Sequence, residues 1–163
     1  IDSIPNIEFY PLPANPDNMS ESYFGGLPEV RIVPDPSYKL FLLEALRNDI
    51  ILREIIEAYT VKNIDSFFAT LTFLSKNNAY LSLREMHRQL KEHEVDISLL
   101  TLIDYINASL NTKILHRSYL HDVKNNNTIQ SKARYYFGDT GIRKTFSDDF
   151  LSENTLYLEL KIF

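Results

Sequence analysis

The chain has 163 residues, of which 44% are hydrophobic and 24% charged, and this size allows one domain or two small ones with a hydrophobic core. The absence of Cys excludes disulfides and thiolate metal sites. The apolar runs are far too short to span a bilayer, and together these features predict a cytoplasmic protein without a membrane partner.

The formal net charge is −5 at pH 7, but the charges are distributed unevenly along the chain. Residues 113–144 contain seven Lys and Arg against two Asp and Glu, whereas residues 1–112 contain nine against 16. The basic segment can neutralise phosphates at a nucleic-acid surface, or it can be an ordinary solvated hairpin. Composition favours the hairpin and leaves the nucleic-acid interpretation open.

The first 36 residues contain all seven prolines, which fix φ and remove backbone donors. We therefore predict an extended, Pro-rich lead-in over residues 1–36. Within it, Gly25 and Gly26 permit positive φ or a close backbone approach, and Pro28 makes a rigid exit. An ordinary turn is favoured over a phosphate-binding loop, because no Gly-rich run ending in Gly-Lys-Ser or Gly-Lys-Thr is present.

A pair of helices is predicted over residues 37–78. Apolar residues recur at steps of three and four over residues 37–61 and again over residues 64–76, without internal Pro or Gly. Such stripes are typical of helices that face a core. Asp49 lies within the first helix, and we interpret it as a packing or salt-bridge position.

Two further helices are predicted over residues 82–93 and 98–111. Ser82 and Glu85 form a capping box, in which each side chain satisfies a backbone amide at the start of the helix. Ser98 caps the second helix, which has a continuous apolar face. Two short helices separated by a turn indicate a helix-turn-helix.

A β-hairpin is predicted after these helices, with strands 114–123 and 129–137. The turn between them is polar and rich in Asn, a residue that tolerates left-handed backbone. Helix, helix and hairpin together predict a winged helix-turn-helix over residues 79–147. The predicted fold class is thus mainly α with a small β wing, in which a helical segment precedes the winged helix-turn-helix.

Three motifs resemble a known family: the Gly-Gly-Leu-Pro-Glu-Val run from Gly25, the aromatic and Gly-Asp-Thr-Gly run from Tyr135, and the run from Glu153 to Leu160. They resemble the region C-terminal to the nucleotide-binding core of prokaryotic P-loop ATPases of the AAA type. In that family a winged-helix segment links the ATPase core to a nuclease-like C-terminal domain. The resemblance implies that residues 148–163 are the truncated start of the nuclease-like domain. The family-motif positions, with an implied structural role, are Gly25, Gly26, Pro28, Asp49, Asp139, Gly141 and Arg143.

Asp139 invites a catalytic interpretation, since carboxylates in Gly-rich turns can bind Mg²⁺ or act as bases. We favour a structural role, in which Asp139 closes an Asx-type turn and Arg143 pairs with it or with a neighbouring module. The four His residues are spaced so that they lie on different faces, and no metal site is predicted. No catalytic residue and no cofactor are assigned to this chain. ATP and Mg²⁺ are expected only with an upstream ATPase core.

Two functions remain open. In the first, a non-catalytic module couples the ATPase core to a C-terminal effector domain through contacts with these domains or with another protein. In the second, the winged helix binds duplex DNA, which requires cations on the exposed face of its second helix. That face is expected to present Thr101, Asp104, Asn107 and Ala108, so coupling is favoured. The candidate residues for a phosphate contact near the wing are Arg84, Arg88, Arg117, Lys124, Lys132 and Arg134.

Overall fold

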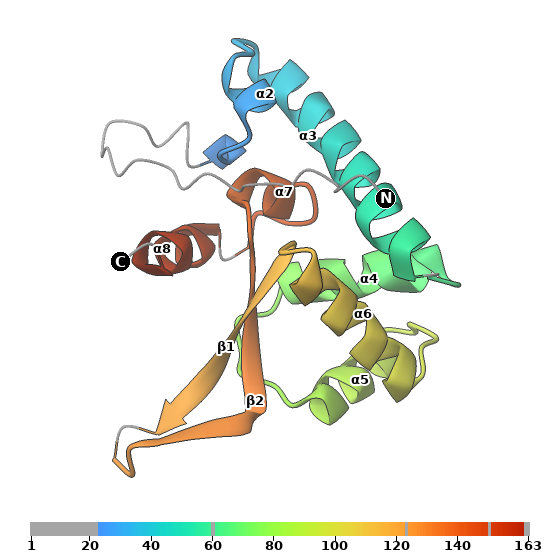
Figure 1. The fold of residues 1–163 in the computed structure, drawn as a ribbon, viewed down its shortest axis with the longest axis vertical. Helices are drawn as coiled ribbons and strands as arrows, with labels where there is room; N and C mark the ends of the chain where they lie inside the picture. Colours follow the sequence, from blue (N-terminus) through green and yellow to red (C-terminus); the bar gives the residue numbers. More distant parts are fainter. Residues whose placement is uncertain (1–22, 60, 123, 150, 162–163) are drawn as a thin grey trace, which may run out of the picture.

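The computed structural model describes residues 23–59, 61–122, 124–149 and 151–161. These residues form a mainly helical chain with a small two-stranded antiparallel sheet (Figure 1). None of the described helices has the length and apolarity that a membrane crossing needs. In chain order the elements are α2 (Pro28–Arg31), α3 (Pro36–Ile50), the π-helical η1 (Ile51–Glu57), α4 (Ile64–Ser75), α5 (Leu83–Glu92), α6 (Leu99–Asn111), β1 (Leu115–Asp122), β2 (Asn127–Phe137), α7 (Thr140–Lys144) and α8 (Leu151–Lys161).

The hairpin of β1 and β2 is the long central element of the fold (Figure 1). Helices α4, α5 and α6 lie on one side of it, and α8 lies on the other. The short helix α7 follows β2 directly and packs against α3 and α8. The hairpin therefore lies between the three helices α4, α5 and α6 and the single helix α8, and α7 is in contact with both α3 and α8.

The helix-start signals in the sequence form the expected bonds. At α5, Ser82 Oγ accepts from the N–H of Glu85 at 3.2 Å, and the Glu85 carboxylate accepts from the N–H of Ser82 at 2.7 Å. The amide of Ser82 is the main cause that lowers the pKa of the Glu85 carboxyl to about 2. At α6, Ser98 Oγ accepts from the N–H of Thr101 at 3.1 Å. The predicted helices 64–76, 82–93 and 98–111 are confirmed.

The predicted helix 37–61 is confirmed as α3 continued by η1. Asp35 is its N-cap, and its side chain accepts from the N–H of Tyr38 at 2.9 Å. The helix widens into the π-helical segment after Ile50 without a break in direction (Figure 1). Its buried residues are Leu43, Ile51 and Ile55.

The prediction of an extended lead-in over residues 1–36 is wrong at α2. Pro28 occupies the first position of this short helix, where the missing backbone N–H would have no helical partner. Gly25 has φ of +81°, a left-handed backbone that Gly adopts readily because it has no Cβ. Residues 1–22 of the predicted lead-in lie outside the described residues.

The predicted hairpin is confirmed, with a shorter turn. β2 begins at Asn127 instead of residue 129, and Asn126 before it has the left-handed φ of 49° that an Asn-rich turn permits. At the other end of the hairpin, Leu115 pairs with Phe137, and both side chains are buried. The far end of the hairpin is exposed, and the near end is part of the core.

Leu81 adds a single antiparallel bridge to β2. Its N–H donates to the carbonyl of Ala133, and its carbonyl accepts from the N–H of Ala133, both at 3.0 Å. The bridge holds the connection between α4 and α5 on the edge of the hairpin.

The core of the described residues joins the helices to the near end of the hairpin. It contains Phe67 of α4, Met86 of α5, Ile106 of α6 and the Leu115 and Phe137 pair. Phe67 also contacts Tyr105 edge to face, with 5.2 Å between ring centroids. The three helices and the hairpin thus share one hydrophobic cluster.

Ile106→Ala is expected to lower the free energy of unfolding by about 2–5 kcal/mol, because Ile106 is buried and the substitution leaves a cavity. Urea denaturation followed by circular dichroism measures this change. The matched control is Ile64→Ala, since Ile64 lies exposed at the start of α4. An unchanged midpoint for Ile106→Ala would show that this face of α6 is not part of the core.

The apolar alternation near the C-terminus belongs to a helix. Apolar and polar residues alternate from Leu156, but the described part of this run, to Lys161, lies in α8, which packs against β2. Alternation over so few residues does not distinguish a strand from a helix. The assignment of residues 148–163 to a following nuclease-like domain stays a prediction.

Candidate functional site

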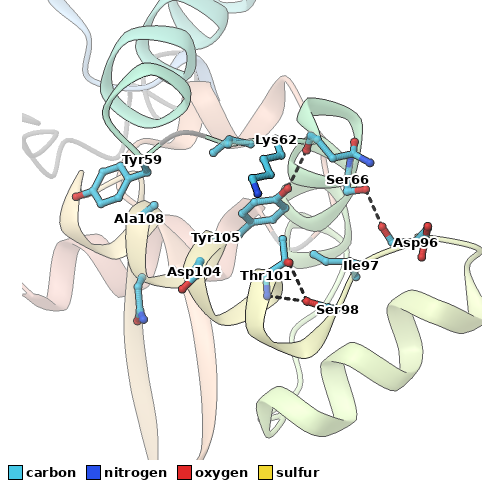
Figure 2. Close-up of a pocket in the computed structure, with 13 residues that line it drawn as sticks. Tyr59, Lys62, Ser66, Asp96, Ile97, Ser98, Thr101, Asp104, Tyr105 and Ala108 are labelled. Atoms are coloured by element: carbon cyan, nitrogen blue, oxygen red, sulfur yellow. Dashed lines mark hydrogen bonds between the residues drawn. The ribbon is translucent and has the colours of Figure 1, made fainter.

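A solvent-open cleft of about 720 Å³ lies beside α6. Its walls come from α6, the start of α4 and the residues that precede these helices (Figure 2). Tyr105 Oη donates to the carbonyl of Asn63 at 2.9 Å, and Ser66 Oγ donates to the carbonyl of Asp96 at 3.1 Å. These two bonds join separate parts of the chain across the cleft, so its shape is fixed by the fold.

The cleft presents polar and aromatic groups to solvent. Asp104 and Asn107 are exposed on α6, and Tyr59 contributes an exposed ring on the same side of the cleft as Asp104 (Figure 2). Lys62 is the one Lys or Arg among the described lining residues, against two carboxylates, those of Asp96 and Asp104. The lining therefore carries a small negative charge.

The predicted exposed face of α6 requires one correction. Asp104 and Asn107 are exposed and Thr101 is partly exposed, but Ala108 is buried. The reason is that Ala108 follows the buried Tyr105 by three positions, which places it at the edge of the core-facing stripe. No Lys or Arg occurs in α6.

Four of the six candidate DNA-contacting residues interact with side chains of their own chain. Arg84 and Lys124 are exposed, and neither forms an ion pair with another described residue. The four pairs are Arg88 with Glu92 at 2.7 Å, Lys132 with Glu85 at 3.2 Å, Arg134 with Glu153, and Arg117 with the ring of Tyr119 at 4.9 Å.

The basic segment 113–144 is not one exposed basic surface. Arg143 is only 2% exposed, and the side chains of Lys144 and Arg134 are 5% and 17% exposed. The ammonium of Lys144 lies 2.9 Å from the ring centroid of Tyr23. Three of the seven cations counted in the sequence are therefore largely buried and serve the fold.

The two glycine motifs contact each other directly, although they are 113 positions apart. The carboxylate of Asp139 accepts from the N–H of Gly26 and of Ile142, both at 2.8 Å. A Cβ at Gly141 would overlap the carbonyl oxygen of Phe24, so the close approach of the two motifs requires Gly there.

Asp139 differs from the predicted Asx-type turn, because it is the N-cap of α7 and bonds the residue three positions on. Burial raises the pKa of its carboxyl, and the backbone donors from Gly26, Ile142 and Gly141 oppose this effect. The carboxylate is 5% exposed and both of its oxygens accept from amides. This arrangement offers no free carboxylate to a substrate.

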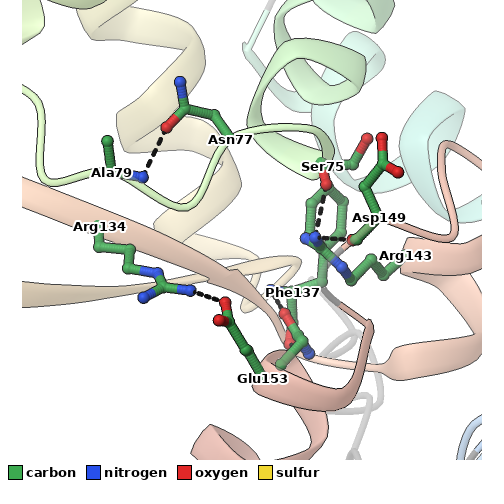
Figure 3. Close-up of polar contacts among 9 residues, drawn as sticks. Ser75, Asn77, Ala79, Arg134, Phe137, Arg143, Asp149 and Glu153 are labelled. Carbon is green, nitrogen blue, oxygen red and sulfur yellow. Dashed lines mark hydrogen bonds and ion pairs between the residues drawn. The ribbon is translucent and has the colours of Figure 1, made fainter.

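Arg143 and Asp139 are joined through the backbone, where the N–H of Arg143 donates to the carbonyl of Asp139 at 3.0 Å, whereas the Arg143 guanidinium has other partners. Its Nη2 donates to the carbonyls of Ser75 and Asp149, each at 2.5 Å, and its guanidinium lies 5.5 Å from the ring centroid of Phe137 (Figure 3). Burial is the main cause that lowers the pKa of Arg143 to about 10, so the side chain keeps its charge at neutral pH. Arg143 thus connects α7 to α4 and to the segment before α8.

Asn154 lies within the motif from Glu153 to Leu160, but the sequence does not indicate its structural role. Its side-chain amide accepts from the N–H of Phe137 at 2.7 Å and donates to the carbonyl of Phe137 at 3.0 Å, within a buried site. Next to it, Arg134 pairs with Glu153 (Figure 3). An Asn on an otherwise apolar helix face would indicate such a buried polar residue from sequence alone. The sequence of α8 has no clear apolar period, so this face could not be recognised.

His116 and Lys161 make a further contact between α8 and the hairpin, with 2.6 Å between Nζ and Nδ1. An ammonium only donates hydrogen bonds, so Nδ1 is the acceptor and His116 is neutral in this contact. Burial, with the nearby charges of Lys161 and Lys113, lowers the pKa of His116 to about 4. The described residues contain no group of three or more His, Asp or Glu side chains that could hold a metal ion.

Exposed apolar side chains form a strip along α3 and η1, which we call the α3 strip: Tyr38, Phe41 and Leu52. Phe41 is 65% and Tyr38 55% exposed, and their ring centroids lie 6.1 Å apart. Leu52 follows Phe41 by three helical turns and lies on the same face. On the same helix, Asp49 is exposed and pairs with Arg53 at 2.8 Å.

No family model matches the chain, and no solved structure matches it significantly. An uncharacterized protein of Haemophilus influenzae is 23% identical to it over 122 residues. The match covers 74% of this chain and 30% of that protein, so the chain spans less than a third of the length of this relative.

Proposed function

We propose that the chain is a non-catalytic module that couples the core of a larger P-loop ATPase to a following effector domain through protein contacts. The observation that carries this proposal is the α3 strip, where two neighbouring aromatic rings are exposed and an exposed leucine follows three turns further along the same helix face. Exposed aromatic residues of this kind are enriched where proteins dock. The greater length of the Haemophilus relative agrees with a module inside a longer protein.

The same proposal includes a winged helix formed by α4 to β2. The order is helix α4, the bridge at Leu81, helices α5 and α6, and the hairpin. Three helices with a short strand between the first and second, followed by a β-hairpin, are the winged-helix arrangement. In this arrangement α6 is the helix that would face a partner.

Duplex-DNA binding through the wing is the alternative, and it has less support. Helix α6 carries no cation, and the cleft beside it is lined by two carboxylates and one ammonium. A negative surface opposes the approach of a phosphate backbone. Most of the candidate cations already interact within the chain.

Hydrogen exchange of the full-length protein tests the coupling. ATP should change the exchange of the α3 and η1 amides, and Phe41→Ser should abolish that change, because Phe41 is the most exposed residue of the α3 strip. The matched control is Ile64→Ser, which removes an exposed apolar side chain from the start of α4, away from the α3 strip. A full-length protein in which ATP leaves the exchange of α3 and η1 unchanged would overturn the coupling.

The 163-residue chain by itself is expected neither to bind nor to hydrolyse ATP, because it has no Gly-rich loop ending in Gly-Lys-Ser or Gly-Lys-Thr to hold the phosphates. Isothermal titration calorimetry with ATP and Mg²⁺ measures this. Micromolar nucleotide binding would contradict the expectation.

A fluorescence anisotropy titration separates the two functions. We expect the chain to bind a random duplex of about 20 base pairs no tighter than the non-specific range of about 10⁻⁴–10⁻⁶ M at physiological salt. The matched control replaces Arg117, Lys124 and Lys132 together with Ser. Nanomolar binding that this triple replacement abolishes would put DNA binding in place of protein contact.

A further inference from the structure

We propose that the cleft beside α6 binds an arginine side chain of a partner protein. The inference rests on the proposed role in protein contact and specifies the chemistry of the partner. The outer side of the cleft combines the exposed ring of Tyr59 and the carboxylate of Asp104 (Figure 2). Asn107, an exposed lining residue three positions after Asp104 on α6, adds an amide.

These three groups match the chemistry of a guanidinium. Its planar array of N–H donors binds a carboxylate with two parallel hydrogen bonds, and its face stacks on aromatic rings. Asp104 and Asn107 are three positions apart on α6, so their side chains lie on one face of the helix and both offer oxygen acceptors. Asp104 forms no ion pair with any described residue, and its carboxylate is free for a partner.

The charge of the cleft selects a cation over other occupants. Asp96 and Asp104 outnumber Lys62, whose side chain extends toward Tyr105 in the inner part of the cleft (Figure 2). An anionic segment would be repelled, and an apolar segment would desolvate unpaired carboxylates without compensation. The ammonium of a lysine lacks the planar fork that can bond a carboxylate twice.

The cleft needs no rearrangement to accept this side chain. The bonds from Tyr105 to Asn63 and from Ser66 to Asp96 fix the relative positions of its walls. With a volume of about 720 Å³, it has room for a guanidinium and part of the chain that carries it.

Nuclear magnetic resonance of the ¹⁵N-labelled 163-residue chain tests the proposal with two capped tripeptides, Gly-Arg-Gly and its neutral counterpart Gly-citrulline-Gly. The arginine peptide should shift the amides of residues 61–63 and 101–108, with an affinity at least about tenfold higher than that of the citrulline peptide. Equal affinities for the two peptides would overturn the proposal.

Two variants locate the site. Asp104→Asn should weaken arginine-peptide binding at least about tenfold, since it removes the charge while keeping the size of an exposed side chain. Glu29→Gln is the matched control, because it removes an exposed carboxylate on α2 and should leave binding unchanged. Binding that Asp104→Asn leaves intact would also overturn the proposal.

The peptide and duplex titrations together distinguish a failure of the arginine site from a failure of the proposed function. If neither the arginine peptide nor a duplex binds, the cleft is not the contact site, and the α3 strip still carries the protein-contact function. If a duplex binds at nanomolar concentration and the cleft binds arginine poorly, both the function and the inference are overturned.

Discussion

Asp139→Ala is expected to lower the free energy of unfolding by at least about 2 kcal/mol. The carboxylate is buried and accepts from the amides of Gly26 and Ile142, so its removal leaves two donors without their acceptor. Each buried donor left unpaired costs about 1–3 kcal/mol. Urea-induced unfolding of the two chains, followed by circular dichroism, measures the difference.

Two variants control this experiment. Asp139→Asn keeps the size but turns one acceptor oxygen into an NH₂ group that faces a backbone donor, and we expect a loss nearly as large. Asp148→Ala removes a nearby carboxylate that is exposed and pairs with Lys144. This substitution should lower the free energy of unfolding by less than about 1 kcal/mol. A loss at Asp139 no larger than the loss at Asp148 would contradict its structural role.

Asn154→Ala is expected to cost about 2–6 kcal/mol, because it leaves both the N–H and the carbonyl of Phe137 unpaired in a buried site. Urea unfolding again gives the change. Asn77→Ala is the matched control, since the side chain of Asn77 accepts from one exposed amide, that of Ala79. Equal losses at the two positions would show that the bond between α8 and β2 contributes little.

Asn154→Asp adds a pH test of the same contact. An ionised carboxylate can accept from the N–H of Phe137 but repels its carbonyl, whereas the protonated form can donate to that carbonyl. The folded state therefore raises the pKa of the introduced carboxyl above its usual value of about 3.9. The stability of this variant relative to the original chain should be highest near pH 4 and fall as the pH rises to 7. If the stability difference between Asn154→Asp and the original chain does not change with pH, residue 154 does not bond both the N–H and the carbonyl of Phe137.

The local elements of this fold could be predicted from sequence because their signals are local. The capping box of Ser82 and Glu85 and the cap at Ser98 involve residues three positions apart, and both form as expected. The apolar periods of α3, α4 and α6 likewise identify helices whose buried residues join one core. The hairpin turn followed from its Asn residues, one of which has the left-handed backbone.

The contacts between distant parts of the chain could not be predicted in the same way. The sequence singles out Gly26 and Asp139, but neither residue indicates that one bonds the other across 113 positions. Arg143 bonds two backbone carbonyls, which leave no trace in the sequence because every residue has one. For this reason the positive charges of segment 113–144 could be counted from the sequence, but the burial of three of them could not be predicted.

The contact between Gly26 and Asp139 has a consequence for the order of folding. Forming it closes a loop of more than a hundred residues, whose entropic cost exceeds that of the turns within α4 to β2. Contacts between residues near in sequence form early, and those that close long loops generally follow. We expect the helices and the hairpin to assemble first and α7 to join Gly26 last. The same contact would then be among the first to open in the native state, which would separate Gly26 from α7 while the core around Ile106 stays folded.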